Sequence, residues 1–264
     1  MLRKSQMPHD ASMPYEAEIP REMRLPREAL DFSLRAELTE LMDEPCSREV
    51  LRSCLRDLAR VNRWFLGYRP VLRWLEGISR GRRNEPLRIL DVGCGYGDGL
   101  RRVERWARKR RISVELTGLD LNADTIAIAR EATPQDSTIR WVPGNVFGYA
   151  PPNSPHLVVS SLFTHHLGEQ DVVRFLQWME NCAEVGWFIN DLSRAPIPYH
   201  LFLWFSKAVR LHPFVQHDGP VSFRRAFVED DWRRLCTAAG LKPNQFAILG
   251  YKPARLCVSR RKTS

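Results

Sequence analysis

The sequence predicts an α/β fold with a mostly parallel sheet of seven strands, helices on both faces of the sheet and a helical N-terminal extension. Short apolar segments alternate with amphipathic segments from Leu87 onward, which is typical of parallel strands joined by helices. A glycine-rich turn directly follows the first of these strands. Ahead of that strand, Leu51, Leu55 and Leu58 follow helical spacing, which predicts the extension.

The composition indicates a globular protein with room for a sizeable core. The chain has 264 residues, 44% of them hydrophobic, and a formal net charge of +9. No segment approaches the roughly 20 apolar residues of a membrane span, and the first residues have no apolar core, so we expect neither a span nor a secretory signal. The six cysteines form no C-x-x-C pair, so we expect reduced thiols, a cytoplasmic location and no metal site.

Three regions are expected along the chain. Residues 1–28 are rich in Met, Pro and charge and predict a mobile arm. Residues 29–85 predict a helical cap, with helical spacing from about Ala29 to about Ser79, which Gly67 and Pro70 divide into two helices. Residues 86–264 predict the main domain, with an insertion at about 194–228 that acts as a lid.

Within the main domain, each element follows from its periodicity and its flanking residues. The expected strands are residues 87–92, 114–121, 138–146, 156–163, 186–191, 245–251 and 255–260. The expected helices are residues 101–110, 123–132, 169–185, 197–209 and 229–241.

The predicted insertion supports more than one interpretation. The helix at 197–209 is apolar nearly all round, which predicts either the wall of a pocket for an apolar acceptor or contact with a membrane surface, given the neighbouring Lys207 and Arg210. The following segment, HDGPVSFRRAF, is interpreted as a turn with a solvated basic stretch. Alternatively, its His217 is a catalytic base.

The glycine turn, D-V-G-C-G-Y-G at residues 91–97, indicates the kind of ligand. No Lys-Ser or Lys-Thr follows it, which excludes a P-loop. The third glycine of a dinucleotide fingerprint is replaced by Asp98. Asp91 would repel a pyrophosphate but suits a cationic amino-acid group, and Asp120 after the second strand can accept hydrogen bonds from both ribose hydroxyls. This combination describes S-adenosylmethionine.

The run from RILDVGCGYGDG through TGLDLNADTIAIAR, WVPGNVFGY, LVVSSLFTHHL and WFINDLSR resembles the Rossmann-like class I S-adenosylmethionine-dependent methyltransferases, over about residues 86–260. The helices before it and the insertion after it are similar to bacterial small-molecule methyltransferases of polyketide or quinone-type pathways. The resemblance implies cofactor contacts from the glycine turn, the two acids and the ends of the next strands. These are Asp91, Gly93, Gly95, Gly97, Asp120, Leu121, Asn145, Val146, Ser161 and Leu162. Asn145 stands where the family usually has an acid that contacts the adenine.

The acceptor side is expected at the carboxyl ends of the fourth and fifth strands. His165 is the predicted general base for an oxygen nucleophile, and His166 is interpreted as structural or close to the cofactor. Asp191 is expected to pair with a histidine, although capping of the next helix is an alternative role. The residues expected to contact the acceptor are Asn190, Arg194, Tyr199 and Arg224.

The predicted function is therefore methyl transfer to a small, largely apolar acceptor, with S-adenosylmethionine as cofactor and no nucleic acid as partner. Two alternatives stay open. The positive charge suits a nucleic-acid methyltransferase, although strand four ends in SSLF and lacks the Asn/Asp-Pro-Pro-aromatic motif of amino-directed DNA enzymes. The other alternative is a cofactor-binding module without turnover.

Overall fold

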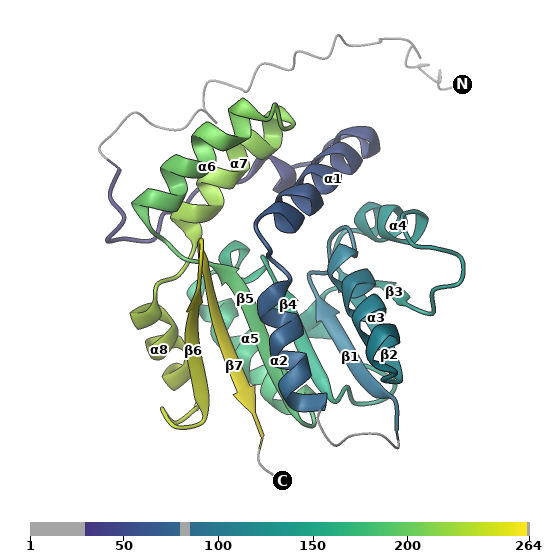
Figure 1. Ribbon diagram of the computed structural model, residues 1–264. Helices are drawn as coiled ribbons and strands as arrows, with labels where there is room; N and C mark the ends of the chain where they lie inside the picture. The colour runs from purple at the N-terminus through teal and green to yellow at the C-terminus, as the bar shows by residue number, and fades with distance from the viewer. Residues whose placement is uncertain (1–29, 80–84, 263–264) are drawn as a thin grey trace, which may run out of the picture.

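The structure, a computed structural model, describes residues 30–79 and 85–262; the predicted mobile arm at 1–28 lies outside the described residues. Its centre is a seven-stranded sheet in the order β3-β2-β1-β4-β5-β7-β6 (Figure 1). The strands are β1 (Leu87–Val92), β2 (Val114–Asp120), β3 (Arg140–Pro143), β4 (Leu157–Ser161), β5 (Gly186–Leu192), β6 (Phe246–Tyr251) and β7 (Arg255–Arg261). The first five are parallel, and β7 is antiparallel to both β5 and β6. This topology confirms the predicted fold class.

Helices cover both faces of the sheet. The first face carries α2 (Arg69–Ser79), α3 (Asp98–Arg110) and α4 (Ala123–Glu131), whose apolar residues share one core cluster with β1, β2 and β4. The second face carries α5 (Glu169–Cys182) and α8 (Glu229–Ala238), which bury Phe175, Met179 and Trp232 against the sheet. Because both faces are covered, the central strands are apolar on both sides, as their sequences indicated.

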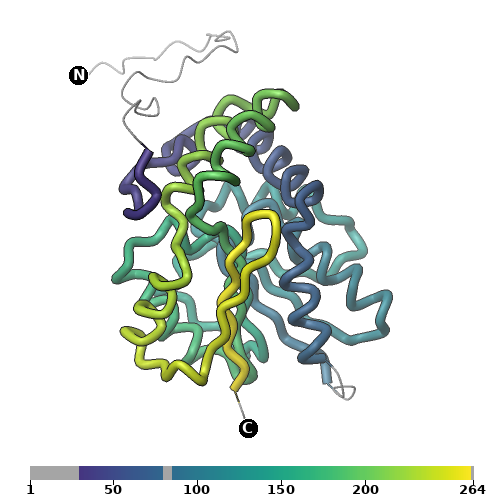
Figure 2. The backbone as a smooth tube through the Cα atoms, turned by 60° about the vertical axis from the view of Figure 1, so that its left-hand side comes forward, coloured from purple at the N-terminus to yellow at the C-terminus, as the bar shows by residue number. Residues whose placement is uncertain are grey.

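Three further helices lie beyond the carboxyl ends of the parallel strands. They are α1 (Arg48–Trp64), α6 (Pro196–Ala208) and α7 (Pro213–Arg225) (Figures 1 and 2). Although α1 is far from the other two in sequence, Cys54 of α1 shares a small buried cluster with Val215 of α7. These helices therefore cover the edge of the sheet where ligands of open α/β folds bind.

Three expectations about individual segments need correction. Helix α1 begins only at Arg48, where the Ser47 hydroxyl caps it. Upstream of it, the backbone N–H groups of Leu41 and Met42 donate to the Asp218 carboxylate. Strand β3 ends at Pro143, and Asn145 caps the short 3-10 helix η3 (Val146–Gly148) that follows. The segment after His217 is part of α7 and largely buried, not a solvated turn.

Helix α6 is partly exposed. Ile197, Leu201 and Trp204 are 72%, 63% and 75% exposed, and the first two also line the open apolar cavity described below. Within the described part of the chain, no helix has the length and apolar character of a membrane span. The six cysteines are all free thiols.

Candidate active site

The glycine turn connects β1 to α3 and forms the floor of a cleft. Gly93, Gly95 and Gly97 all have positive φ angles, of 69°, 51° and 75°. A Cβ at Gly97 would lie 2.2 Å from the Trp141 ring, so only glycine fits there. A Cβ at Gly95 would meet no atom within 4 Å, so this stretch of backbone is open to a ligand. The sequence predicted both the turn and its open backbone.

Two carboxyl groups line the cleft, one buried and one partly buried. Asp91 is buried at the end of β1, and burial, with the nearby Asp98 and Asp120, raises its pKa to about 8. Asp98 begins α3 and accepts a hydrogen bond from the Tyr68 hydroxyl. Burial raises the pKa of Asp98 as well, against the effect of that hydrogen bond. A positively charged group in the cleft would offset the electrostatic repulsion among these carboxylates.

The ends of β2 and β3 form the rim beside the cleft. Asp120 accepts hydrogen bonds from the backbone N–H groups of Gly95 (2.9 Å) and Asn122 (3.1 Å), and each oxygen keeps a lone pair for another donor. The next residue, Leu121, is 73% exposed, and Asn145 is exposed at the neighbouring strand end. Val146, in contrast, is buried in the core.

The opposite wall of the cleft is built from β4 and β5. Ser161, Leu162 and Asn190 all line it. The Asn190 amide donates to Gly67 O (2.9 Å) and to Ser161 Oγ (3.3 Å), while the left-handed Leu162 donates its N–H to Asn190 O (3.0 Å). Asn190, expected on the acceptor side, therefore lies at the cofactor side of the site.

Arg255 at the start of β7 is a site residue that the sequence analysis missed. Its Nη2 donates to Asn62 Oδ1 (2.6 Å). Its Nη1 is buried and finds no hydrogen-bond partner among the described residues. Of the described residues that line this cleft and the cavity beside it, Arg255 is the only arginine or lysine.

These residues fit the amino-acid end and the ribose of S-adenosylmethionine. The Nη1 of Arg255, which has no partner among the described residues, can donate to a carboxylate, and Asp91 and Asp98 can face an ammonium group and a sulfonium. Asp120 can accept from ribose hydroxyls beside the open Gly95 backbone. The cleft thus offers a separate partner for each charged group of that cofactor.

A second, apolar cavity of about 400 Å³ adjoins the cleft and shares Leu58, Asn62, Leu162 and Arg255 with it. Its apolar lining comes mainly from α1, α6 and α7: Val61, Phe65, Ile197, Leu201, Phe202, Phe205 and Phe223. Its polar end is formed by Glu40, His165, His166, Asp218 and Ser222. This shape suits a small apolar molecule with a polar group at one end.

His165 and Asp191 form a buried pair behind this polar end. Asp191 accepts from His165 Nδ1 (2.7 Å), from the His165 backbone N–H (3.0 Å), from the Thr164 hydroxyl and from the Leu192 N–H (2.7 Å). Burial acts to raise the pKa of Asp191, but the His165 ring and these hydrogen bonds hold it well below its ordinary value. An ionised carboxylate only accepts, so Nδ1 carries a hydrogen, and in the neutral ring Nε2 then presents a lone pair.

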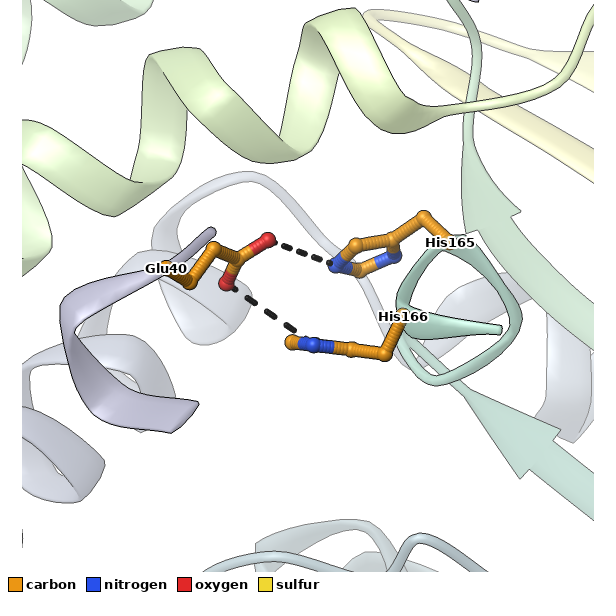
Figure 3. Close-up of side chains that lie close together, drawn as sticks. All are labelled: Glu40, His165 and His166. Atoms are coloured by element: carbon orange, nitrogen blue, oxygen red, sulfur yellow. Dashed lines mark ion pairs between the residues drawn. The ribbon is translucent and has the colours of Figure 1, made fainter. Parts of the chain in front are cut away.

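Glu40 is the second residue that the sequence analysis missed. Its oxygens lie 3.7 Å from His165 Nε2 and 3.8 Å from His166 Nε2. Figure 3 marks these two ion pairs with dashed lines. Ser222 Oγ donates to Glu40 at 2.9 Å. Burial raises the pKa of Glu40 to about 7, while the nearby His166 acts in the opposite direction. No motif surrounds Glu40, so only its position in space reveals it.

Four residues predicted for the acceptor side lie outside the described lining of the cavity. Arg194 donates to Ala226 O (2.7 Å) and Phe32 O (3.0 Å) and so ties loops together. Tyr199 is buried with its ring edge against Phe32. His217 bonds Asp218 through Nδ1 (2.8 Å), and Arg224 follows on the same helix. His165, the predicted base, contacts Asp191 as expected, whereas these four residues do not line the cavity beside it.

Part of the chain matches known methyltransferases. Residues 89–186 match the model of a methyltransferase domain. A trans-aconitate 2-methyltransferase from Rhodopseudomonas palustris (strain BisB18) is 32% identical over 163 residues, which is 61% of this chain and 53% of that protein. The chain thus spans about half the length of this curated relative.

Solved structures share the fold at low sequence identity. The plantazolicin methyltransferase BpumL, in complex with a triazolic desmethylPZN analog and SAH, superposes with a TM-score of 0.59 at 12% identity, over 82% of this chain and 97% of that chain. The citrinin polyketide synthase CMeT domain superposes with a TM-score of 0.54 at 17% identity, over 73% of this chain and 52% of that chain. At these identities the likeness shows the fold alone.

Proposed function

We propose, from the class I S-adenosylmethionine-dependent methyltransferase domain that this chain carries, that the protein methylates an oxygen of a small, largely apolar acceptor. The acceptor class that fits is an aromatic, quinone-like or polyketide-derived molecule. One observation carries the proposal: the cleft and the apolar cavity meet at Asn62, Leu162 and Arg255, and His165 lies at the polar end of the cavity.

The cleft residues hold and orient the cofactor in this proposal. S-adenosylmethionine supplies an activated methyl group on a positively charged sulfur when it is bound. Asp120 accepts from the ribose, Asp91 and Asp98 face the cationic end, and Arg255 takes the carboxylate. The apolar walls from α1, α6 and α7 exclude water and fix the acceptor, because positioning is a large part of the catalysis of a displacement reaction.

His165 is the residue that takes the proton of the acceptor hydroxyl. Asp191 holds the hydrogen on Nδ1, so the lone pair of Nε2 points toward the cavity. General-base catalysis of this kind contributes about 10²–10⁴-fold in rate. Asp191 is a positioning residue, because it acts through His165 and lies behind it.

Calorimetry and methyl transfer together test the proposal. The native chain is expected to bind S-adenosylhomocysteine (SAH), the product that S-adenosylmethionine leaves after methyl transfer. It is also expected to transfer labelled methyl groups from S-adenosylmethionine to one or more members of a panel of phenols, quinols and enols. The panel also includes trans-aconitate, because the relative that is 32% identical over 163 residues is a trans-aconitate 2-methyltransferase. His165→Ala is expected to retain SAH binding and to lose transfer by about 100-fold or more. The matched control is His200→Ala, an exposed histidine of α6.

Three results would contradict the proposal. The first is binding of a pyrophosphate nucleotide with no binding of SAH. The second is methyl transfer to DNA or RNA only, together with a steep salt dependence of nucleic-acid binding. The third is SAH binding with no transfer to any acceptor class, which would favour a binding module.

A further inference from the structure

Glu40, His165 and His166 at the polar end of the cavity are arranged like the ligands of one metal ion. Each offers one ligand atom, and these atoms all lie within 4.8 Å of one another. Glu40 precedes α1, whereas both histidines belong to the 3-10 helix η4 (Thr164–His166) after β4, so the fold brings together distant segments (Figure 3). The two imidazole rings are 4.3 Å apart between centroids and are tilted by 34°.

A carboxylate orients each histidine from behind. His165 Nδ1 lies 2.7 Å from Asp191 Oδ1, and His166 Nδ1 lies 3.2 Å from Asp43 Oδ1. Both Nε2 atoms therefore face Glu40. Metal-binding histidines almost always donate their other ring N–H to a carboxylate, a carbonyl or water, which fixes the ring and raises its basicity. Both histidines of this cluster therefore have the supporting carboxylate that is typical of metal-binding histidines.

The distances to Glu40 are too long for direct hydrogen bonds but fit a shared ion. The two Nε2–Oε separations are 3.7 and 3.8 Å, beyond the ordinary hydrogen-bond range. Two ligand atoms that each bind one zinc ion at about 2.1 Å, with an angle of about 110–130°, lie about 3.4–3.8 Å apart. The two separations lie in this range, one to Oε1 and one to Oε2 of Glu40, and the ligand atoms of all three residues lie within 4.8 Å of one another.

The surrounding charges leave room for a cation. Two guanidinium groups adjoin the cluster. Arg35 Nη2 donates to His165 O at 2.7 Å. Arg225 Nη1 lies 3.1 Å from Asp43 Oδ2 and 3.5 Å from Glu40 Oε1. Its Nε and Nη2 donate to the backbone carbonyls of His165 and His166, so it also fixes the loop that carries them. Four carboxylates belong to this cluster and its support: Glu40, Asp43, Asp191 and Asp218. A divalent ion would offset their excess charge.

We infer that Glu40, His165 and His166 bind a divalent transition-metal ion, with zinc as the best match, and leave its remaining positions open to the cavity. Two imidazoles, one carboxylate and an open position form a recurrent ligand set for catalytic zinc. All three ligands line the cavity that we assign to the acceptor. The inference deepens the proposed function, on which its catalytic part rests, and replaces the expectation from sequence that no metal is bound.

A bound ion would change what activates the acceptor. An ion on His165 Nε2 occupies the lone pair that a general base needs. The ion itself would lower the pKa of an acceptor hydroxyl that binds at its open position, as metal ions do for water, and the released proton would pass to solvent. The acceptor oxygen would bond to the methyl carbon as the sulfur–methyl bond breaks, and the sulfur would keep that electron pair. His165 becomes a ligand, and Asp191 keeps its positioning role.

Titration with Zn²⁺ tests the inference without any acceptor. The purified full chain is stripped with a chelator and titrated with Zn²⁺ by calorimetry. We expect one ion per chain in the native protein. Glu40→Gln and His166→Ala are expected to weaken binding by about tenfold or more, since each removes one ligand. His200→Ala, outside the cluster, is expected to bind like the native chain, and SAH binding by every variant shows that it is folded.

The result that overturns the inference is Zn²⁺ binding in Glu40→Gln and His166→Ala equal to that of His200→Ala, or no stoichiometric binding in the native chain. If metal-free and zinc-loaded protein transfer methyl groups at equal rates, the ion does not activate the acceptor, and His165 remains the proposed general base. Zinc binding without any methyl transfer would instead contradict the proposed function and leave the metal site intact.

Discussion

Replacing Asp191 by alanine tests how much one buried carboxylate contributes to this fold. Asp191 is 2% exposed and accepts four hydrogen bonds, three of them from residues 164 and 165 in the 3-10 helix η4 that follows β4. In Asp191→Ala these donors lose their acceptor in a region with little access to water. Each unsatisfied buried donor costs about 1–3 kcal/mol, and relaxation recovers part of the sum.

We therefore expect Asp191→Ala to lower the free energy of unfolding by about 3–5 kcal/mol, the range for breaking one side of a buried polar pair. For a domain of this size each kcal/mol corresponds to about 2–4 °C in Tm, so the melting temperature is expected to fall by about 6–20 °C. The matched control is Asp171→Ala, whose side chain is 45% exposed and paired with Arg174 on the surface of α5. That change is expected to cost less than about 1 kcal/mol.

The pH dependence gives a second readout of the same pair. The pKa of Asp191 in the folded protein lies below its unfolded value of about 3.9. Its stabilisation is therefore fully present above about pH 4 and is lost as the pH falls toward the folded pKa. Urea unfolding at several pH values measures both effects. If Asp191→Ala and Asp171→Ala unfold at the same urea concentration at neutral pH, the assigned hydrogen bonds do not stabilise the fold as argued.

Three further changes test other parts of the site. Asp120→Ala is expected to weaken SAH binding by about 2–4 kcal/mol in calorimetry, since two charge-assisted hydrogen bonds to ribose are lost; unchanged affinity would remove Asp120 from the cofactor site. Because the pKa of Asp91 is raised to about 8, the free protein holds this proton at neutral pH. SAH binding is therefore expected to strengthen by roughly tenfold or more from about pH 5.5 to about pH 7.5, as the carboxylate forms against a cationic group; a native profile as flat as that of Asp91→Asn would contradict this. Gly219→Ala is expected to destabilise the protein by about 1–3 kcal/mol, because the new Cβ would lie 1.9 Å from Phe202 Cε1 and force α6 and α7 apart; thermal unfolding unchanged from that of the native chain would show that the contact is loose.

Local patterns in the sequence were enough to predict the sheet and the cofactor side of the site. Runs of apolar residues predicted the strands. The glycines at 93, 95 and 97 predicted a turn directly after the first strand. In a parallel sheet the carboxyl ends of the strands share one edge, so Asp91, Asp120 and His165 could be assigned to that edge before their contacts were known. The pairing of His165 with Asp191 follows from the same rule, since β4 and β5 are neighbours.

The acceptor side depended on contacts that no local pattern encodes. Glu40 lies in an irregular segment and Arg255 on the last strand, and nothing in their sequence neighbours distinguishes them from solvated charges. Gly219 and Pro220 indicated a turn, yet the segment is helical, because a glycine lets α7 pack closely on Phe202 of α6. Spacing along a chain determines which face of an element is apolar, but only the packing of distant elements decides which buried charges meet. The sequence alone therefore determined the sheet and the cofactor edge, whereas the tertiary structure decided the cavity and the cluster of Glu40 with two histidines.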